Sequence, residues 1–175
     1  MSFLKVLSGN GAGSGDDDLE ELLHRGYRYA MALTHAPEEA EDLVHDACVS
    51  IVRSRGEWTK GYLLTTIRNR FIDKYRREQT LLFVPLETGP ELAGDSSDDG
   101  VERDYLLTGA LDEALGELRA DEREVLFLSA VEGYTAQEIA DLSSRPRGTV
   151  LSLLHRTKSK LRNVLSGRVG ARGTL

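Results

Sequence analysis

Side chains that can bind phosphate gather in the last part of the chain. The 175 residues carry a formal net charge of −7, yet no Asp or Glu occurs from Ser143 to Leu175. A basic segment in an acidic chain is suited to hold nucleic acid, because Lys and Arg displace the counterions around a phosphate backbone. A solvated basic face on an ordinary helical hairpin is the alternative on these residues alone. The cations of the segment are Arg145, Arg147, Arg156, Lys158, Lys160, Arg162, Arg168 and Arg172.

The spacing of polar residues before this segment predicts a helix-turn-helix. Thr135 and Glu138 have the S/T-x-x-E spacing of a capping box, so we expect a helix to begin at Thr135. Ser143 and Ser144 weaken its continuation, and Pro146 suits the first turn of a second helix. The turn between the helices would then be about three residues long, the length typical of this motif.

The second helix has an apolar arc and a polar face. At 3.6 residues per turn, one narrow arc collects Val150, Leu154, Leu161 and Leu165, so these side chains should pack inward. Leu151 and Leu153 flank the arc and widen the apolar stripe. The opposite face holds Ser152, His155, Arg156 and Ser159.

A second basic helix is expected from about Lys60 to Glu78. Aromatic side chains interleaved with cations suit a surface that stacks unpaired bases, although aromatic residues at helical spacing also occur in cores. The presence of two basic elements in one acidic chain favours nucleic acid. The apolar side holds Leu63, Leu64, Ile67, Phe71 and Tyr75, with Trp58 and Tyr62 nearby, and the cations are Arg68, Arg70, Lys74, Arg76 and Arg77.

The helix that follows Pro37 combines a buried stripe with an acidic face. The predicted stripe consists of Ala40, Leu43, Val44, Ala47, Cys48, Ile51 and Val52, and the opposite face of Glu41, Asp42, His45 and Asp46. Acidic residues near a helix N-terminus are explained by the helix dipole alone. His45 and Cys48 do not make a zinc site, because two ligands are too few, and we expect no metal or other cofactor.

Helical patterns on either side of a break in periodicity favour an all-α protein of two small bundles. We expect a disordered tail at 1–18, bundles at 19–79 and 105–166, a flexible acidic linker at 80–104 and a C-terminal tail at 167–175. No apolar run is long enough to cross a membrane. The single cysteine excludes an intrachain disulfide and favours the cytoplasm. Neither a nucleophile with its base nor a phosphate-binding glycine loop is evident, so we do not expect an enzyme.

Three blocks of the chain, in this order, resemble the extracytoplasmic-function (ECF) group of bacterial sigma factors. EEAEDLVHDACVSIVR is similar to the group's core-binding segment, and IRNRFIDKYRRE to its promoter-melting segment. LDEALGELRADEREVLFLSAVEGYTAQEIADLSSRPRGTV is similar to its C-terminal helix-turn-helix domain. The resemblance implies a transcription initiation factor that binds core RNA polymerase and promoter DNA, opens the duplex and is held inactive by an anti-sigma factor.

The resemblance also implies roles for individual residues. Asn69 matches the residue beside the pocket for a flipped base of the minus-ten element. Ser152, His155 and Arg156 match the helix that enters the major groove at the minus-thirty-five element. The full assignments are Asp42, Leu43, His45 and Asp46 for core polymerase; Arg68, Asn69, Arg70, Asp73, Arg76 and Arg77 for minus-ten DNA; and Arg147, Ser152, His155, Arg156 and Lys158 for minus-thirty-five DNA.

Departures from the family pattern leave an alternative open. Leu151 and Leu153 stand where basic residues are usual, Ser143 and Ser144 replace Leu-Gly in the turn, and Arg145 replaces an apolar residue. The leucines would offer an apolar flank to an anti-sigma factor. A sigma-like decoy that sequesters an anti-sigma factor without initiating transcription is therefore the second hypothesis. A simple helix-turn-helix repressor would leave the melting segment unexplained.

Overall fold

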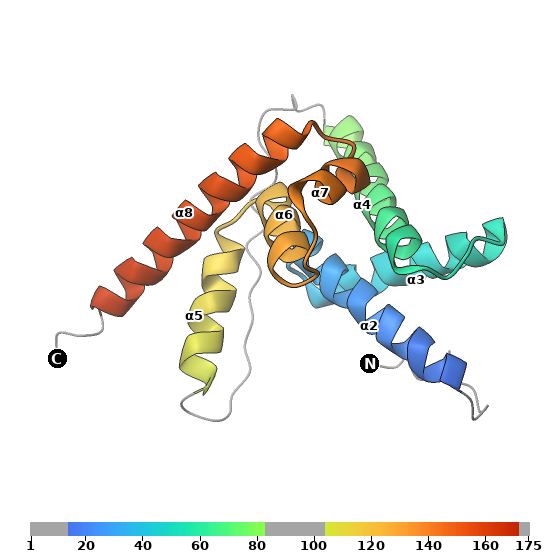
Figure 1. The fold of residues 1–175 in the computed structure, drawn as a ribbon, viewed down its shortest axis with the longest axis horizontal. Coiled ribbons are helices and arrows are strands. Elements are labelled where there is room, and N and C mark those ends of the chain that lie inside the picture. The colour runs from blue at the N-terminus through green and yellow to red at the C-terminus, as the bar shows by residue number, and fades with distance from the viewer. Residues whose placement is uncertain (1–13, 83–103, 172–175) are drawn as a thin grey trace. The chain divides into compact units, whose positions relative to one another are not determined.

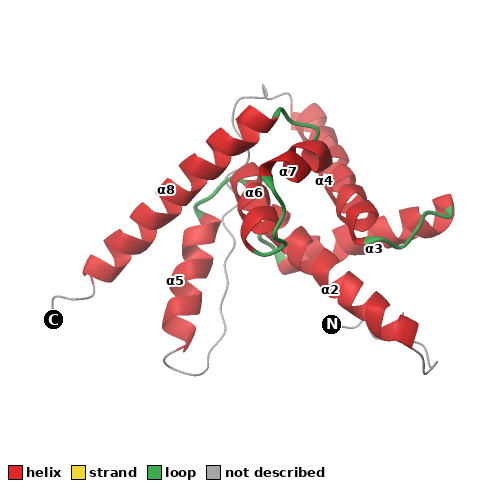
Figure 2. Cartoon of the chain, viewed as in Figure 1, coloured by secondary structure: helices red, strands yellow, loops and turns green. Residues whose placement is uncertain are grey.

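The chain folds into seven helices over the residues that the structure, a computed structural model, describes: 14–82 and 104–171 (Figure 1). Within those ranges every element is a helix or a loop, which confirms the all-α class (Figure 2). The chain divides into two compact units, residues 1–85 and 86–175. The helices are α2 (Ser14–Thr34), α3 (Pro37–Ser54), α4 (Lys60–Leu82), α5 (Asp104–Gly116), α6 (Ala120–Ala130), α7 (Ala136–Ser143) and α8 (Arg147–Ala171).

In the first unit, α2, α3 and α4 pack against one another around one apolar core. Gly26 lets α2 approach α4 closely, because a Cβ there would lie only 3.0 Å from Leu63 Cδ2 and 3.1 Å from Ile67 Cδ1. The fully buried side chains of this core include Tyr29, Ile51, Leu63, Leu64 and Ile67.

Helix α3 has the predicted stripe except at its last position. Pro37 begins the helix, and Glu38 and Glu39 lie in the first turn, where carboxylates oppose the positive end of the helix dipole. Val52, however, is 63% exposed, so its assignment to the buried stripe was wrong. The α3 helix ends two residues later, at Ser54, followed by Arg55 in the left-handed conformation (φ 52°), and the helix residues after Ile51 are exposed. The six other stripe residues are buried.

In the second unit, α6 and α7 pack on α8, and α5 lies against the same long helix. The apolar positions from Leu107 to Leu128 could continue through one long helix. The structure instead ends α5 at Gly116 and begins α6 at Ala120. The Glu122 side chain accepts a hydrogen bond from the Arg119 backbone N–H (2.9 Å), which caps the new helix. The core includes Val125, Leu128, Ile139, Val150 and Thr157.

Helix ends differ from the predicted segment boundaries. α2 begins at Ser14, inside the predicted tail; α4 continues to Leu82 and α8 to Ala171. Most of the predicted acidic linker, and the tail residues 1–13 and 172–175, lie outside the described residues. Among the described residues, no helix has both the length and the apolar character that crossing a bilayer requires.

Candidate nucleic-acid interface

The helix-turn-helix forms as its capping residues predict. Thr135 caps α7: its hydroxyl accepts from the Glu138 N–H (3.3 Å), and the Glu138 carboxylate accepts from the Thr135 N–H (2.8 Å). Three residues separate α7 from α8, and the Pro146 carbonyl accepts from Thr149 N–H (2.9 Å) and Val150 N–H (3.2 Å). The capping box and the turn length are confirmed.

The two serines of the turn act in different ways. The Ser143 hydroxyl is buried and donates to the Ile139 carbonyl at 2.6 Å, so a polar residue occupies a core position without an unsatisfied donor. Ser144 takes the left-handed conformation (φ 54°) that usually selects glycine at a helix C-terminus. The Arg145 N–H then bonds the Ala140 carbonyl (3.0 Å), which closes the turn.

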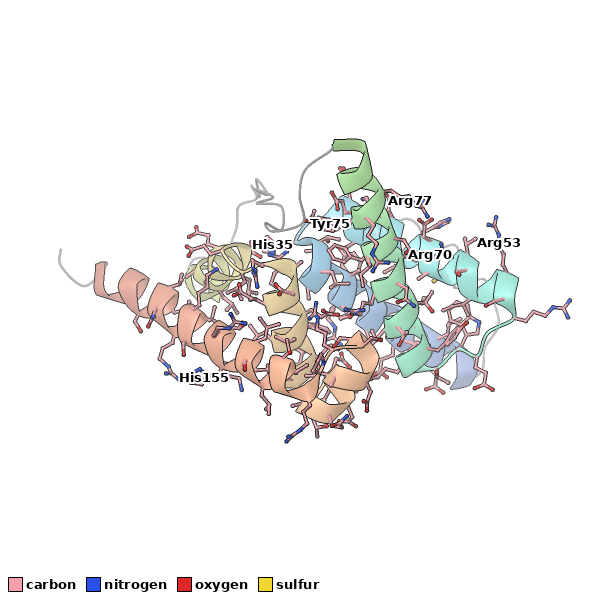
Figure 3. The ribbon with its side chains drawn as sticks, turned by 90° about the horizontal axis from the view of Figure 1, so that it is seen from above. His35, Arg53, Arg70, Tyr75, Arg77 and His155 are labelled. Atoms are coloured by element: carbon pink, nitrogen blue, oxygen red, sulfur yellow. The ribbon has the colours of Figure 1, made fainter. Side chains whose placement is uncertain are left out.

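Helix α8 exposes every residue assigned to the minus-thirty-five element. His155 projects from its outer side (Figure 3). The buried arc holds Val150 and Leu154, while Leu161 and Leu165 are half-buried. The exposed set is Arg147, Ser152, His155, Arg156 and Lys158.

The apolar flank predicted on α8 divides into two unlike residues. Leu153 is only 3% exposed and belongs to the core, whereas Leu151 is 43% exposed. Leu153 is therefore a packing residue of the second unit, and the prediction of a two-leucine surface was wrong. The buried arc of α8 is wider than the four residues predicted from the sequence. It also includes Leu153 and Thr157, which lie about one turn apart.

Two cations of the basic segment contact other parts of the second unit. Lys160 Nζ lies 2.6 Å from the Glu117 carbonyl oxygen and 3.4 Å from Glu122 Oε2. Arg145 Nη1 lies 3.1 Å from Oε2 of the buried Glu124, an ion pair without hydrogen-bond geometry. Both cations hold parts of the second unit together. The spacing of the cations does not predict this contact for Lys160, whereas the apolar residue that is usual in the family at position 145 indicates an inward position for Arg145.

Helix α4 exposes only part of its predicted DNA-facing set. Asn69, Asp73, Arg76 and Arg77 are exposed. Arg68 is only 8% exposed, unlike the four exposed residues of this set, and its assignment to DNA stays a prediction.

Arg70 is half-buried, and its Nη2 donates to Ser50 Oγ of α3 at 2.7 Å (Figure 3). Ser50 was not recognised from the sequence, because its contact joins residues twenty positions apart.

Aromatic side chains lie near the start and in the middle of α4. Phe71 and Tyr75 stack with ring centroids 6.3 Å apart and planes 12° from parallel. Trp58 and Tyr62 are exposed beside the α3–α4 loop. Gly56 permits the Tyr62 ring to lie on that loop, since a Cβ there would meet Tyr62 Cε1 at 2.5 Å.

The acidic face of α3 presents three of the four residues assigned to core polymerase. Asp42, His45 and Asp46 are exposed. Leu43 is buried in the core, so its side chain does not lie on this exposed face and its assignment to core polymerase stays a prediction. Cys48 is also buried, and burial raises the pKa of its thiol to about 11.

Comparison with known proteins identifies both units. Sigma-70 region 2 matches residues 19–80, and sigma-70 region 4 matches residues 108–161. RNA polymerase sigma factor CarQ of Myxococcus xanthus is 33% identical over 141 residues, which cover 72% of this chain and 74% of CarQ. ECF RNA polymerase sigma factor SigE of Mycolicibacterium smegmatis is 28% identical over 159 residues, covering 87% of this chain but only 62% of SigE.

A solved structure has a similar fold. The sigma factor RpoE of Bartonella quintana, crystallised with the anti-sigma factor NepR, superposes with a TM-score of 0.66 at 23% identity, over 89% of this chain and 98% of RpoE. Together with the region 2 and region 4 matches and the similarity to CarQ, these findings show that the chain belongs to the ECF group of the sigma-70 family of bacterial RNA polymerase sigma factors.

Proposed function

We propose that this chain is a transcription initiation factor that binds core RNA polymerase, recognises the minus-ten and minus-thirty-five promoter elements and promotes DNA melting. The observation that carries the proposal is the match to sigma-70 regions 2 and 4, in that order, on two separate units. The chain acts as a DNA-binding regulator and contributes no catalytic residue of its own.

The two basic helices have different tasks in this proposal. α8 holds duplex DNA mainly through phosphate, with Ser152, His155 and Arg156 near enough to its outer face to reach base edges. Asn69 acts after strand separation, because a short amide can specify a flipped base by hydrogen bonds but adds no charge toward intact duplex. Arg76 and Arg77, exposed on the same helix, hold the phosphates of the opened strand.

Core polymerase binds the acidic face of α3 in this account. Asp42 and Asp46 lie four residues apart on one exposed face, with His45 beside them. These carboxylates are not needed for packing, because the buried stripe on the opposite side of α3 makes the contacts with the core. This separation leaves the acidic face available to a basic partner surface.

An anti-sigma factor is proposed as a further partner. The similar fold of RpoE was solved in complex with one, and Leu151 offers an exposed apolar side chain on α8. Because Leu153 is buried, the surface on α8 is smaller than the sequence indicated. We place the protein in the cytoplasm, where promoter DNA and polymerase are found.

Run-off transcription with purified core polymerase on a genomic promoter library tests the proposal. Transcripts that begin downstream of a shared two-part motif, and only when the chain is added, are the expected result. Stable binding to core polymerase without any initiation would contradict it and favour a decoy that sequesters an anti-sigma factor.

A further inference from the structure

Two carboxylates of α6 lie inside the second unit, and each faces a cation from the helix-turn-helix. Glu124 is only 2% exposed and has Arg145 Nη1 at 3.1 Å; Glu122, also buried, has Lys160 Nζ at 3.4 Å. Arg145 comes from the turn that sets where α8 begins, and Lys160 from the middle of α8. α6 thus holds the turn before α8 through Glu124 and the middle of α8 through Glu122.

Of the two ion pairs, the one between Arg145 and Glu124 is the more deeply buried. A carboxylate this deeply buried loses most of its hydration, so removing Arg145 takes away a compensating positive charge that lies 3.1 Å from it, which costs stability. The side chain of Arg145 is itself mostly covered, whereas that of Lys160 is 42% exposed. The position of the turn residue Arg145 is therefore more strongly restricted than that of Lys160.

Arg145 also lies among the cations of the basic segment, where its charge alone would suggest a phosphate contact. Its guanidinium is directed to Glu124, and the opposite charges largely cancel when seen from the DNA. From this geometry we infer that Arg145 is a positioning residue: paired with Glu124, it fixes the turn and so the orientation in which α8 meets duplex DNA. The inference rests on the proposed function, because it concerns how that DNA is bound.

Promoter binding by the complex of core polymerase and the full chain separates positioning from phosphate contact. For Arg145→Gln we expect the affinity for duplex promoter to fall about tenfold, as when only a tenth of the molecules hold α8 correctly. The slope of log K against log salt should stay as in the wild type, since no phosphate contact is lost. Adding Glu124→Gln should restore affinity, because the paired amides leave no buried charge.

The control variants sharpen this reading. Arg156→Ala removes an exposed cation and should lower the salt slope by about one unit, with no rescue by Glu124→Gln. Lys160→Gln should weaken binding less than Arg145→Gln, since its partners are more exposed.

The orientation itself is measured with an iron chelate attached at Leu151→Cys, which cleaves promoter DNA near α8. Leu151 is exposed, and the buried Cys48 should not compete for the reagent. Arg145→Gln should move or broaden the cleavage pattern, and the double variant should return it to the wild-type positions. Weaker cleavage at unchanged positions would show a role in stability alone and overturn the inference.

Two further results would also overturn it. One is a salt slope lowered by about one unit in Arg145→Gln without rescue, which marks a phosphate contact. The other is wild-type affinity and cleavage in Arg145→Gln. If the wild-type complex itself fails to bind promoter DNA, the proposed function fails, and the inference fails with it; the wild-type arm thus separates the two failures.

Discussion

The two basic helices, α4 and α8, present their polar side chains in different ways. On α8 all five residues assigned to DNA are exposed, and the inward-facing cation, Lys160, is a different residue. On α4, Arg68 is buried and Arg70 bonds Ser50, which leaves an exposed amide, Asn69, flanked by partly or fully covered cations. Under the proposed function, this contrast is consistent with α8 holding duplex DNA through charge and α4 reading a base after melting.

The largest expected effect concerns the acidic face of the first unit. Asp42→Arg combined with Asp46→Arg should abolish association with core polymerase, because it reverses the charge of the whole face while leaving the core intact. Association is measured by co-elution with core polymerase, and folding by circular dichroism.

The matched control makes the same change on α2, where Asp18→Arg with Glu20→Arg alters two exposed acidic residues of the same unit. Equal loss in both double variants would point to net charge, and unchanged association of the α3 variant would refute the assignment of that face.

The next effect compares two neighbouring leucines of α8. Leu153→Lys should lower the free energy of unfolding of the second unit by about 3 kcal/mol or more, because it places an ammonium in the core. Leu151→Lys should change it by no more than about 0.5 kcal/mol. Denaturant titration followed by circular dichroism measures both, and similar values for the two variants would contradict the burial difference.

A smaller effect compares the left-handed helix ends of the two units. Ser144→Gly and Arg55→Gly should each stabilise their unit by about 0.5–1 kcal/mol, because glycine adopts positive φ without a Cβ clash. Trp58, the single tryptophan, reports the first unit by fluorescence, and circular dichroism reports both. Ser144→Ala serves as the control, and a glycine variant no more stable than the alanine variant would contradict the account.

Helical periodicity predicted most of the fold because one buried face determines each helix. The capping box at Thr135, the three-residue turn and six of seven stripe residues in α3 follow from local spacing. The side-chain positions that were not predicted depend on contacts between residues far apart in the sequence. Arg68 and Lys160 are long side chains whose charge predicts the surface, and only the neighbouring helix shows whether they stay there.

The residues assigned to the functional site divide in the same way, into those that are exposed as expected and those that are buried. Asn69, His155 and Arg156 are exposed as expected, whereas Leu43 was assigned by resemblance to a motif although its own place in the apolar stripe predicted burial. The resemblance assigned a role to the segment as a whole, but it did not distinguish the side chains that are exposed from those that hold the helix in place.

The division of labour between α4 and α8 is tested most directly by promoter binding and transcription on paired duplex and pre-melted templates of the same promoter. Asn69→Ala should leave closed-complex affinity and its salt dependence unchanged while disfavouring the open complex by about 1–3 kcal/mol, the value of one lost base contact. Arg156→Ala should lower the salt slope by about one unit and spare transcription from the pre-melted template. An Asn69→Ala defect that appears in full at the closed complex, or an Arg156→Ala defect equally large on the pre-melted template, would contradict the account.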